Sequence, residues 1–551
     1  MPKSEEQLVE DMERELIHII SETNGISLSN TLELLSYSPI SRKNPLVLKN
    51  VDEFIQLLAM FHINEVPIEK LLDHPVSQAF REFFKLFPIS YHEEHIHLTG
   101  SLSAEFIYPK LKKLIEGPQK EIYKKKIVEV YGNDAWPITS VQDVDYLIRL
   151  KEGEQFKTYL KILFLPKLIL IDKQAHVDAA YHMASELNQK YNIGKIRLKF
   201  TLSRSSGISS EQIPGTTEVS EEDVVLGLYE GFSKYQKEVP TFDFVLSPSF
   251  RKEADFYDSG KHKSKKEHFN QQVNSIIGLL EKYPYLEAHL KEVDTVGDEK
   301  ELYRKAHFEE MRTGLRRLQY GGFRIRSHHG ETWKVLRKGV QSVDNAMNIW
   351  HIDTLEHGLS LGVNPNYYFH RIYQKAMELN RMGKGPDTQS QLYDELDDME
   401  WHDPRVKEKI LNGEAINEDE ETSFIKTKFH TAREIEHYQH DVLNRMIHKK
   451  VSLVALPSSN LKLTGMFPDY KDHPFSWWEK KGVNLGIGTD NYITLSTDYI
   501  KELLILLFSD PENLKITKLL MVATKEKRRP FISHLLWKMR KDIVKSKPKK
   551  S

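Results

Sequence analysis

The sequence predicts an α/β protein: a TIM-type (β/α)8 barrel with an N-terminal helical extension and a long helical insertion late in the barrel. From about residue 93, short apolar or β-branched runs alternate with long helical stretches, which is typical of parallel βα units. There are eight such runs, the number of strands in a closed barrel. The expected strands are residues 95–100, 196–202, 242–247, 288–296, 323–327, 354–356, 452–456 and 484–488.

The first 88 residues are expected to form helices. Ser4 and Gln7 fit a capping box, and apolar residues from Leu8 onward follow at helical spacing. A second helix is expected around residues 54–61. Nothing in this segment indicates chemistry, so we interpret it as a helical cap or an oligomerisation element.

The barrel is expected to span residues 89–540, with an insertion at about 363–445. This connection is long and polar for a barrel loop, with acidic runs at 394–400 and 418–421. Connections of this length are usually functional, helical in their own right, or disordered; we expect a helical lobe. Residues 541–551 form a basic tail, which we expect to lack regular structure.

The absence of cysteine removes several classes of site. The chain can form no disulfide, no thiolate zinc site and no cysteine nucleophile. It also lacks the thiolates of the zinc deaminases that carry a Pro-Cys-x-x-Cys motif. A metal ion must therefore bind to His, Asp or Glu, and the 24 histidines supply enough donors.

Charge and hydropathy indicate neither a nucleic-acid partner nor a membrane. The net charge is only −2, and no run of 18 uncharged apolar residues occurs. The N-terminal residues also lack the apolar segment of a secretory signal. We therefore expect a cytoplasmic protein.

Histidines occur at the ends of two expected strands. His95 and His97 are two apart, so in a strand both imidazoles point to one face and can converge on one metal ion. Polar surface strands also carry such pairs. His328 ends a later apolar strand, where Gly330 permits a sharp turn and Glu331 would enter the barrel mouth. The alternative for this second group is a solvated polar loop.

Two further groups, Glu356-His357-Gly358 and Gly488-Thr489-Asp490-Asn491, end two other expected strands. Either one alone is close to uninformative. Together with the earlier histidines, however, they fall at the C-terminal ends of four different strands. In a barrel of this type that end carries the active site.

The order of these groups resembles the adenosine and AMP deaminase family of metal-dependent amidohydrolases, from about His95 to the end of the chain apart from the insertion. EHIHLTGSL resembles the family's His-x-His-Leu-Asp-Gly-Ser, and VDTVGDE its Asp-Leu-x-Gly-x-Glu. SHHGET resembles His-Ala-Gly-Glu, and LEHG resembles Ile-Gly-His-Gly. LPSSN resembles Cys-Pro-x-Ser-Asn, and GIGTDN resembles Thr-Asp-Asp-Pro. Six motifs in the same order are far more specific than any one of them.

The resemblance implies one zinc ion per chain, bound by His95, His97, His328 and Asp490. Three His ligands and a carboxylate with one open position suit catalytic zinc, which lowers the pKa of bound water toward 7. His357 and Asp490 would orient that water toward purine C6.

The remaining implied roles concern the purine ring. Glu331 would share a proton with N1, which makes C6 open to attack, and the adduct would expel ammonia. Gly297 would offer its backbone N–H to N3, where a side chain would block approach. The implied reaction is hydrolytic deamination in purine nucleotide metabolism.

The sequence departs from the family at two positions. Thr99 replaces the Asp that holds the ribose 5′-hydroxyl, and a neutral Thr would not repel a 5′-phosphate as Asp would. This favours a 5′-monophosphate such as AMP or dAMP. Asn491 replaces the Asp that faces purine N7; its amide can donate directly, or it indicates another base. For a phosphate, Arg204 and Lys462 are candidates, against the alternative of solvated surface charges.

Two other functions stay open. One is a hydrolase of the same superfamily that acts on another substrate, which Asn491 and the insertion leave possible. The other is a catalytically silent scaffold, against which the complete ligand set argues. The expected partner is a small purine nucleotide or nucleoside, and the N-terminal extension or the insertion offers a surface for a homo-oligomer.

Overall fold

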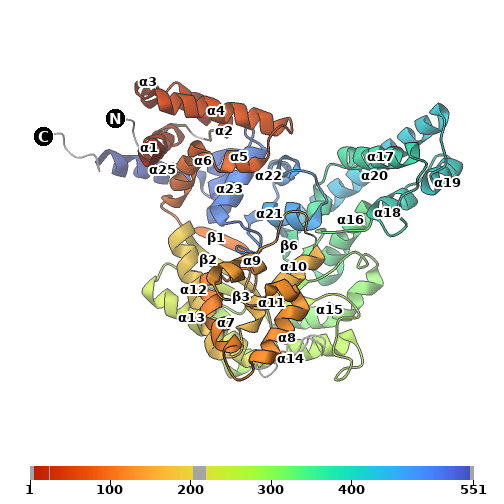
Figure 1. The fold of residues 1–551 in the computed structure, drawn as a ribbon, viewed down its shortest axis with the longest axis horizontal. Coiled ribbons are helices and arrows are strands. Elements are labelled where there is room, and N and C mark those ends of the chain that lie inside the picture. Colours follow the sequence, from red (N-terminus) through yellow and green to blue (C-terminus); the bar gives the residue numbers. More distant parts are fainter. Residues whose placement is uncertain (1–4, 24, 155, 203–218, 546–551) are drawn as a thin grey trace.

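The computed structural model describes residues 5–23, 25–154, 156–202 and 219–545, and eight parallel strands form its centre (Figure 1). The strands pair in chain order from β1 to β8. They are β1 (Tyr91–His97), β2 (Ile193–Thr201), β3 (Asp243–Arg251), β4 (Glu292–Val296), β5 (Arg324–His329), β6 (Thr354–His357), β7 (Ser452–Ala455) and β8 (Leu485–Ile487).

The barrel closes between β1 and the residues that follow β8. Asp490 and Ile96 form a parallel bridge. The Asp490 N–H donates to the His95 carbonyl at 2.9 Å, and the His97 N–H donates to the Asp490 carbonyl at 2.7 Å. The predicted (β/α)8 barrel is therefore confirmed.

All eight expected strands are present, with shifted ends. β1 begins four residues earlier than expected, at Tyr91, and ends at His97, because the chain turns at Leu98 rather than continuing to Gly100. The fourth strand is shorter than expected. Its expected first residue, Ala288, ends a 3-10 helix, Pro284–Ala288, and β4 begins only at Glu292.

Helices surround the barrel and fill the connection between β1 and β2. That connection contains α7 (Ala104–Ile115), α8 (Lys120–Tyr131), α9 (Val141–Ile148), α10 (Phe156–Ile162), α11 (Phe164–Leu168) and α12 (Lys173–Tyr191). The following strands are joined by α13 (Glu221–Glu238), α14 (Lys265–Lys282), α15 (Lys305–Tyr320) and α16 (Leu336–Asn345). After β7 come α21 (Pro457–Ser459), α22 (Phe475–Lys481), α23 (Tyr499–Ser509), α24 (Ile516–Thr524) and α25 (Arg529–Lys545). Since α25 extends to Lys545, the first residues of the expected tail are helical.

The N-terminal residues form helices, as expected. They are α1 (Glu5–Glu22), α2 (Leu28–Ser36), α3 (Pro39–Lys43), α4 (Pro45–His62), α5 (Ile68–Leu72) and α6 (Pro75–Lys85). These helices pack against the C-terminal ones, α1 on α25 and α6 on α23. The Arg81 guanidinium contacts the Asp498 carboxylate at 2.8 Å across this interface. Both ends of the chain thus share one hydrophobic core.

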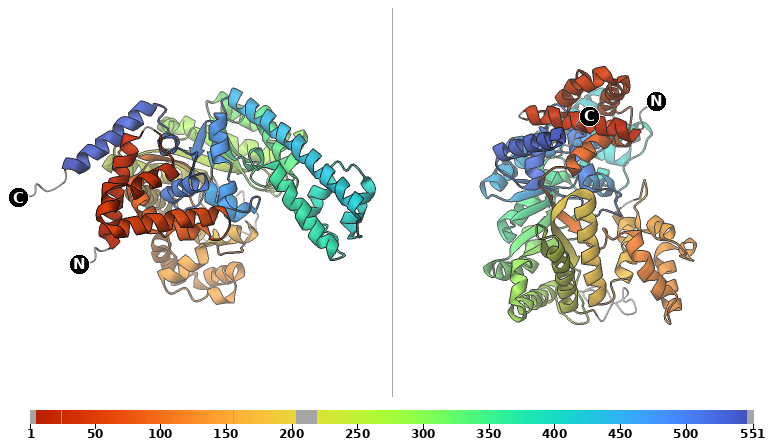
Figure 2. Two further views of the ribbon diagram at one scale, coloured as in Figure 1. Left: turned by 90° about the horizontal axis from the view of Figure 1, so that it is seen from above. Right: turned by 90° about the vertical axis from the view of Figure 1, so that its left-hand side faces the viewer.

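The insertion forms a helical arm that projects from the barrel (Figures 1 and 2). It consists of α17 (Pro365–Arg381), α18 (Gln391–Asp398), α19 (Pro404–Asn412) and α20 (Glu418–His448). The arm has its own hydrophobic cluster, built on residues such as Phe369, Phe424 and Ile435. The last helix, α20, leads directly into β7, so it also connects β6 to β7.

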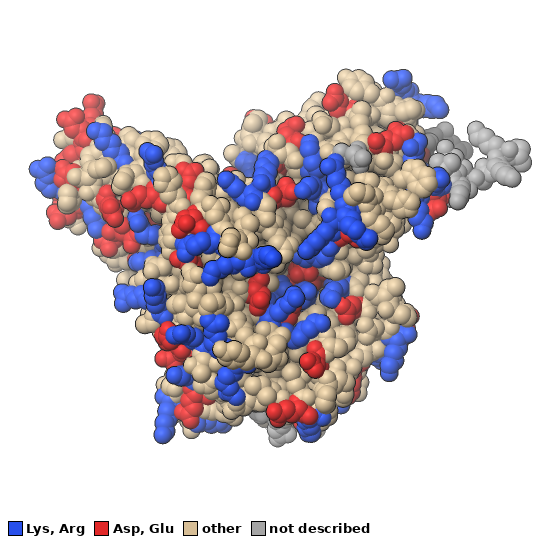
Figure 3. Space-filling model, turned by 180° about the vertical axis from the view of Figure 1, so that it is seen from behind, with Lys and Arg blue, Asp and Glu red and all other residues tan. Residues whose placement is uncertain are grey.

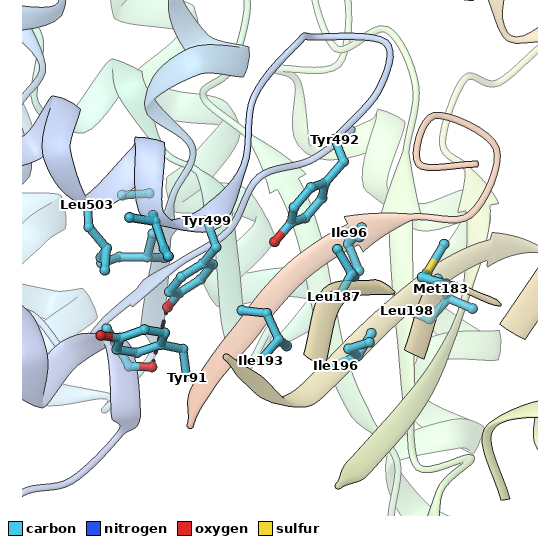
Figure 4. Packing of buried hydrophobic residues seen from close by; sticks show 14 of the residues in the cluster. Tyr91, Ile96, Met183, Leu187, Ile193, Ile196, Leu198, Tyr492, Tyr499 and Leu503 are labelled. Atoms are coloured by element: carbon cyan, nitrogen blue, oxygen red, sulfur yellow. Dashed lines mark hydrogen bonds between the residues drawn. The ribbon is translucent and has the colours of Figure 1, made fainter. Parts of the chain in front are cut away.

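Apolar residues on the outer face of the strands pack against the surrounding helices. Ile96, Ile196 and Leu198 lie beside Met183 and Leu187 of α12 (Figure 4). This packing leaves the alternate residues of β1, which include His95 and His97, to face the barrel interior.

Charges of both signs alternate over the rear face of the molecule, where a notch separates the arm from the N-terminal helices (Figure 3). Within the described residues, no helix has both the length and the apolar character needed to cross a bilayer.

Candidate active site

The predicted metal and catalytic residues meet at the C-terminal ends of four strands. β1, β5 and β6 carry His95, His97, His328 and His357, and Asp490 follows β8. His357 and Asp490 adopt left-handed φ angles of +67° and +64°. Such conformations cost on the order of 1–3 kcal/mol for residues other than glycine, and they cluster at functional sites.

The ligand atoms of the first strand and of Asp490 lie close together. His95 Nε2 and His97 Nε2 are 3.1 Å apart. Asp490 Oδ1 lies 3.4 Å from His97 Nε2 and 3.8 Å from His95 Nε2. Zinc ligands about 2.0–2.1 Å from a tetrahedral ion are roughly 3.3 Å apart, so this spacing fits one shared ion.

Buried carboxylates orient two of the imidazoles. The His95 Nδ1–H donates to Glu356 at 2.8 Å, and the His328 Nδ1–H donates to Asp294 at 3.1 Å. The Nε2 atom of each ring then turns toward the site, as is usual for metal-binding histidines. Lys199 bridges the two carboxylates, 2.9 Å from Glu356 and 3.1 Å from Asp294.

Burial keeps most of these imidazoles neutral. It lowers the pKa of His95 to about 3, although Glu356 opposes the shift. It also lowers the pKa of His97 and of His357 well below the usual value. At His328 burial acts in the same direction, but the Asp294 carboxylate outweighs it and raises the pKa. A neutral imidazole has the free electron pair that a metal ligand needs.

His357 and Glu331 face each other beside the ligand atoms. His357 Nε2 lies 3.8 Å from Glu331 Oε2 and has no hydrogen-bond partner among the described residues, although the ring is fully buried. Burial raises the pKa of Glu331 to about 7 and that of Asp490 to about 6. A carboxyl group with a pKa near 7 can both donate and accept a proton at neutral pH.

The residues fit a metal ion. Ligand atoms within 4.8 Å of one another form two overlapping sets, His95 with His97 and Asp490, and His95 with His328 and His357. Buried histidine nitrogens and a carboxylate are the donors that zinc prefers. His95 belongs to both sets, so the four predicted ligands lie around this residue, with His328 grouped with His357 rather than with His97 and Asp490.

Glu299 holds the loop that carries Glu331. Its carboxylate accepts the backbone N–H groups of Gly330, Glu331 and Thr332 at 2.8, 2.6 and 2.8 Å. Gly330 adopts a φ of +66°, and a Cβ there would collide with the Ser360 side chain. The predicted sharp turn is thus present, and it directs three N–H groups at one carboxylate.

The insertion holds the same loop from the other side. The Trp333 indole N–H donates to the Tyr368 hydroxyl at 3.1 Å, and that hydroxyl donates to Glu395 at 2.6 Å. Glu395 also accepts the backbone N–H of Leu336, the first residue of α16, at 2.7 Å. Gln391 donates to the Trp333 carbonyl at 3.2 Å. Residues of α17 and α18 therefore contact a segment that begins two residues after Glu331.

Two of the predicted substrate-binding residues lie in the first turn and next to Asp490. Thr99 is half-buried in the turn after β1. The Asn491 amide donates to Asp490 Oδ1 at 2.5 Å and to the Tyr159 hydroxyl at 2.6 Å. It also packs so closely on Gly100 that a Cβ there would overlap it.

The other three candidates for substrate binding are Gly297, Lys462 and Arg204. Gly297 follows β4 with a φ of +107°, and a Cβ there would meet the Glu253 carboxylate. Lys462 donates to the Leu495 carbonyl at 2.5 Å, so its ammonium is already engaged. Arg204 lies outside the described residues.

Several residues of the site had no assigned role in the sequence analysis. Lys199 is a charged residue inside an apolar strand, and the only signal was that such charges are rarely buried without a partner. Asp294 and Glu356 lay inside quoted motifs but were given no role. Glu299 lay in a recognised motif but had no assigned role. Asn460, whose amide donates to His357 Nδ1 at 2.9 Å, was in the same position.

Comparison with known proteins finds similar folds at low identity. No protein-family model matches the chain, and no curated protein matches it. Its neighbours among solved structures include a cog1816 amidohydrolase from Burkholderia ambifaria with bound Zn, at 13% identity and a TM-score of 0.47, covering 84% of this chain and 94% of that one.

Two other neighbours are named as nucleotide complexes or deaminases. One is ADAL in complex with IMP, at 11% identity and a TM-score of 0.47, covering 84% of this chain and 99% of that one. The other is the N6-methyl-AMP deaminase from Arabidopsis thaliana, at 11% identity and 0.44, covering 82% and 96%. At such identities and scores the likeness carries no functional conclusion.

Proposed function

We propose that this chain is a zinc-dependent hydrolase that removes the 6-amino group of an adenine nucleotide or nucleoside, with a 5′-monophosphate such as AMP or dAMP favoured. The observation that carries the proposal is the convergence of His95, His97, His328 and Asp490 next to His357 and Glu331. The adenine base is inferred from the six motifs that surround these residues. The proposed catalytic barrel spans residues 89–540.

The four proposed ligands, His95, His97, His328 and Asp490, would hold one zinc ion. When bound, zinc supplies Lewis acidity, which lowers the pKa of water toward 7. Glu356 and Asp294 keep His95 and His328 in the orientation that presents Nε2. Lys199 would compensate the charge of both carboxylates and so prevent their mutual repulsion.

His357 and Asp490 would orient the attacking water, and Glu331 would exchange a proton with purine N1. Water adds to C6 and the C6–N6 bond breaks, so that ammonia leaves with a proton. Glu331 would protonate N1 as C6 is attacked, and N1 keeps this proton in the 6-oxo product. Of the two protons of the water molecule, one leaves with ammonia and the other restores Glu331. A pKa near 7 suits both steps, since the group must give and recover a proton at the same pH.

The test is a substrate panel read by ammonia release. Adenosine, deoxyadenosine, AMP, dAMP, ATP and N6-methyl-AMP are compared by kcat/KM on zinc-replete protein. We expect a monophosphate to give the highest value. If zinc is bound but none of these compounds is turned over, the second candidate function is favoured. This candidate is a hydrolase of the same superfamily that acts on another substrate, and Asn491 in place of Asp supports it.

The proposal includes self-association through the N-terminal helices. The outer face of α4 exposes Leu48 and Ile55, and the exposed Ile63 follows directly after the helix. Apolar residues grouped on one surface are typical of protein–protein contacts. Light scattering on the parent and on an Ile55→Asp variant tests this, and a parent that is monomeric at micromolar concentration would exclude it.

A further inference from the structure

The buried residues behind His357 form a chain of hydrogen bonds whose direction is fixed at its far end. The backbone N–H of Phe475, at the start of α22, lies 3.3 Å from His473 Nδ1. A backbone N–H can only donate. His473 Nδ1 must therefore accept, and the proton of a neutral His473 ring must be on Nε2.

His473 is held in this neutral form by its surroundings. The ring is buried and lies edge-on to Phe467 and Trp478, with centroids 5.8 and 5.7 Å away. Burial lowers the pKa of His473 to about 3. Its Nε2–H donates to Asn460 Oδ1 at 3.3 Å.

The orientation of the Asn460 amide in turn determines whether His357 Nδ1 donates or accepts. Because its oxygen faces His473, its amide nitrogen faces His357 Nδ1, 2.9 Å away. The amide nitrogen is a donor, so His357 Nδ1 accepts. The single proton of the neutral His357 ring is then on Nε2, which lies 3.8 Å from Glu331 Oε2.

We propose that Asn460 and His473 are positioning residues that fix His357 in the Nε2–H tautomer. His357 then presents a hydrogen-bond donor to the site, whereas the ligand nitrogens present electron pairs. This assigns His357 to holding the oxygen of the attacking water rather than to binding metal, although it lies within ligand distance of His95 and His328. The role of His357 toward the attacking water rests on the proposed function. The assignment of the His357 tautomer does not depend on that function.

The tautomer is measured on the zinc-loaded protein by 15N NMR of histidine-labelled samples. The His357 signal is identified by its loss in a His357→Gln variant. We expect a protonated Nε2 and an unprotonated Nδ1 in the parent. A proton on Nδ1 overturns the proposal, whatever the activity.

Asn460→Asp reverses the direction of the last bond. A carboxylate can accept from His473 but cannot donate to His357, so we expect the His357 proton to move to Nδ1. For ammonia release we expect kcat to fall about 10²-fold or more with a smaller change in KM and with zinc content retained. An unchanged tautomer would overturn the proposal.

Variants at His473 and a matched control separate positioning from packing. Gln at 473 keeps a donor toward Asn460, so His473→Gln should retain the Nε2–H tautomer, whereas His473→Leu should give a mixture. Asn380→Asp is the control, because Asn380 is another buried amide, bonded to the Glu414 carbonyl within the arm. It should leave the His357 tautomer unchanged, and a shift there would count against a specific role for Asn460.

Failure of the proposed function is recognised separately. If the parent shows the Nε2–H tautomer and Asn460→Asp reverses it, but no adenine compound is deaminated, the positioning stands and the substrate assignment falls. If deamination occurs while Asn460→Asp keeps the parental kcat, the positioning falls and the enzyme assignment stands.

Discussion

Asp490 and Ile96 form the bridge at which the barrel closes. The two hydrogen bonds of this bridge involve the backbone of His95 and His97, so the seam of the barrel and three of the proposed ligands coincide. The ligand spacing is thus set by backbone pairing rather than by side-chain rotamers alone. Opening of the barrel at this seam would therefore separate these three ligands.

We expect about one zinc ion per chain after zinc-replete expression, measured by mass spectrometry of the metal. Asp294→Asn should weaken zinc binding about 10–100-fold, because Asp294 orients His328. The control is His430→Ala, in an exposed cluster with Glu400 and Glu434 that also has ligand spacing. Zinc lost equally in both variants would mean that the barrel site is not the metal site.

Glu331→Gln should fold, keep its metal and lose activity by about 10²–10⁴-fold in kcat. The amide has the shape of the carboxyl group but cannot move a proton to purine N1. His357→Ala should be similarly impaired. Glu301→Gln, an exposed residue two positions from Glu299, should behave as the parent. Activity of Glu331→Gln within a few-fold of the parent would exclude the proton-transfer role.

Thr99→Asp should reduce activity on the monophosphate far more than on adenosine. A carboxylate about 4 Å from the 5′-phosphate, at an effective dielectric near 20, repels it by roughly 4 kcal/mol per charge pair. Each 1.4 kcal/mol corresponds to about a tenfold change. The measurement is kcat/KM on both substrates, with Thr99→Val as the neutral control. Equal losses on the two substrates would contradict the assignment.

Glu395→Gln should make the protein less sensitive to pH. Burial raises the pKa of Glu395 to about 8, so the stability that its protonated form contributes is fully present below about pH 4.5 and is lost as pH rises through 8. Gln keeps the acceptor for Tyr368 and Leu336 but does not ionise. Between pH 5 and 8, the parent should lose up to about 1.4 kcal/mol per pH unit relative to the variant, measured by urea unfolding. If the unfolding free energies of the parent and the variant changed with pH in parallel, ionisation of Glu395 would not destabilise the folded protein.

The sequence was sufficient to predict the barrel, because the apolar runs and the strand-end motifs indicate the same eight strands. It also predicted that His95, His97, His328 and Asp490 would converge, which follows once parallel strands place their C-terminal ends at one edge. Strand ends were less certain, as at Tyr91 and Glu292, because turns depend on tertiary contacts that local patterns do not encode.

The residues behind the ligands could not be predicted in the same way. Lys199 and Glu356 are far apart in sequence, and nothing local indicates that they pair inside the barrel. Likewise, nothing near His473 indicates that it contacts Asn460 rather than solvent. The contact of Trp333 with Tyr368 depends on how the insertion folds back, which its acidic composition did not reveal.

Because the insertion folds back in this way, the arm is attached to the barrel at two places. Its last helix, α20, runs on into β7, and Gln439 on that helix donates to the Ser360 and Val363 carbonyls beyond β6. At the other attachment, Trp333 is fastened to α17 by its indole. A displacement of the arm would therefore be transmitted through these hydrogen bonds to the segments that follow Glu331 and His357.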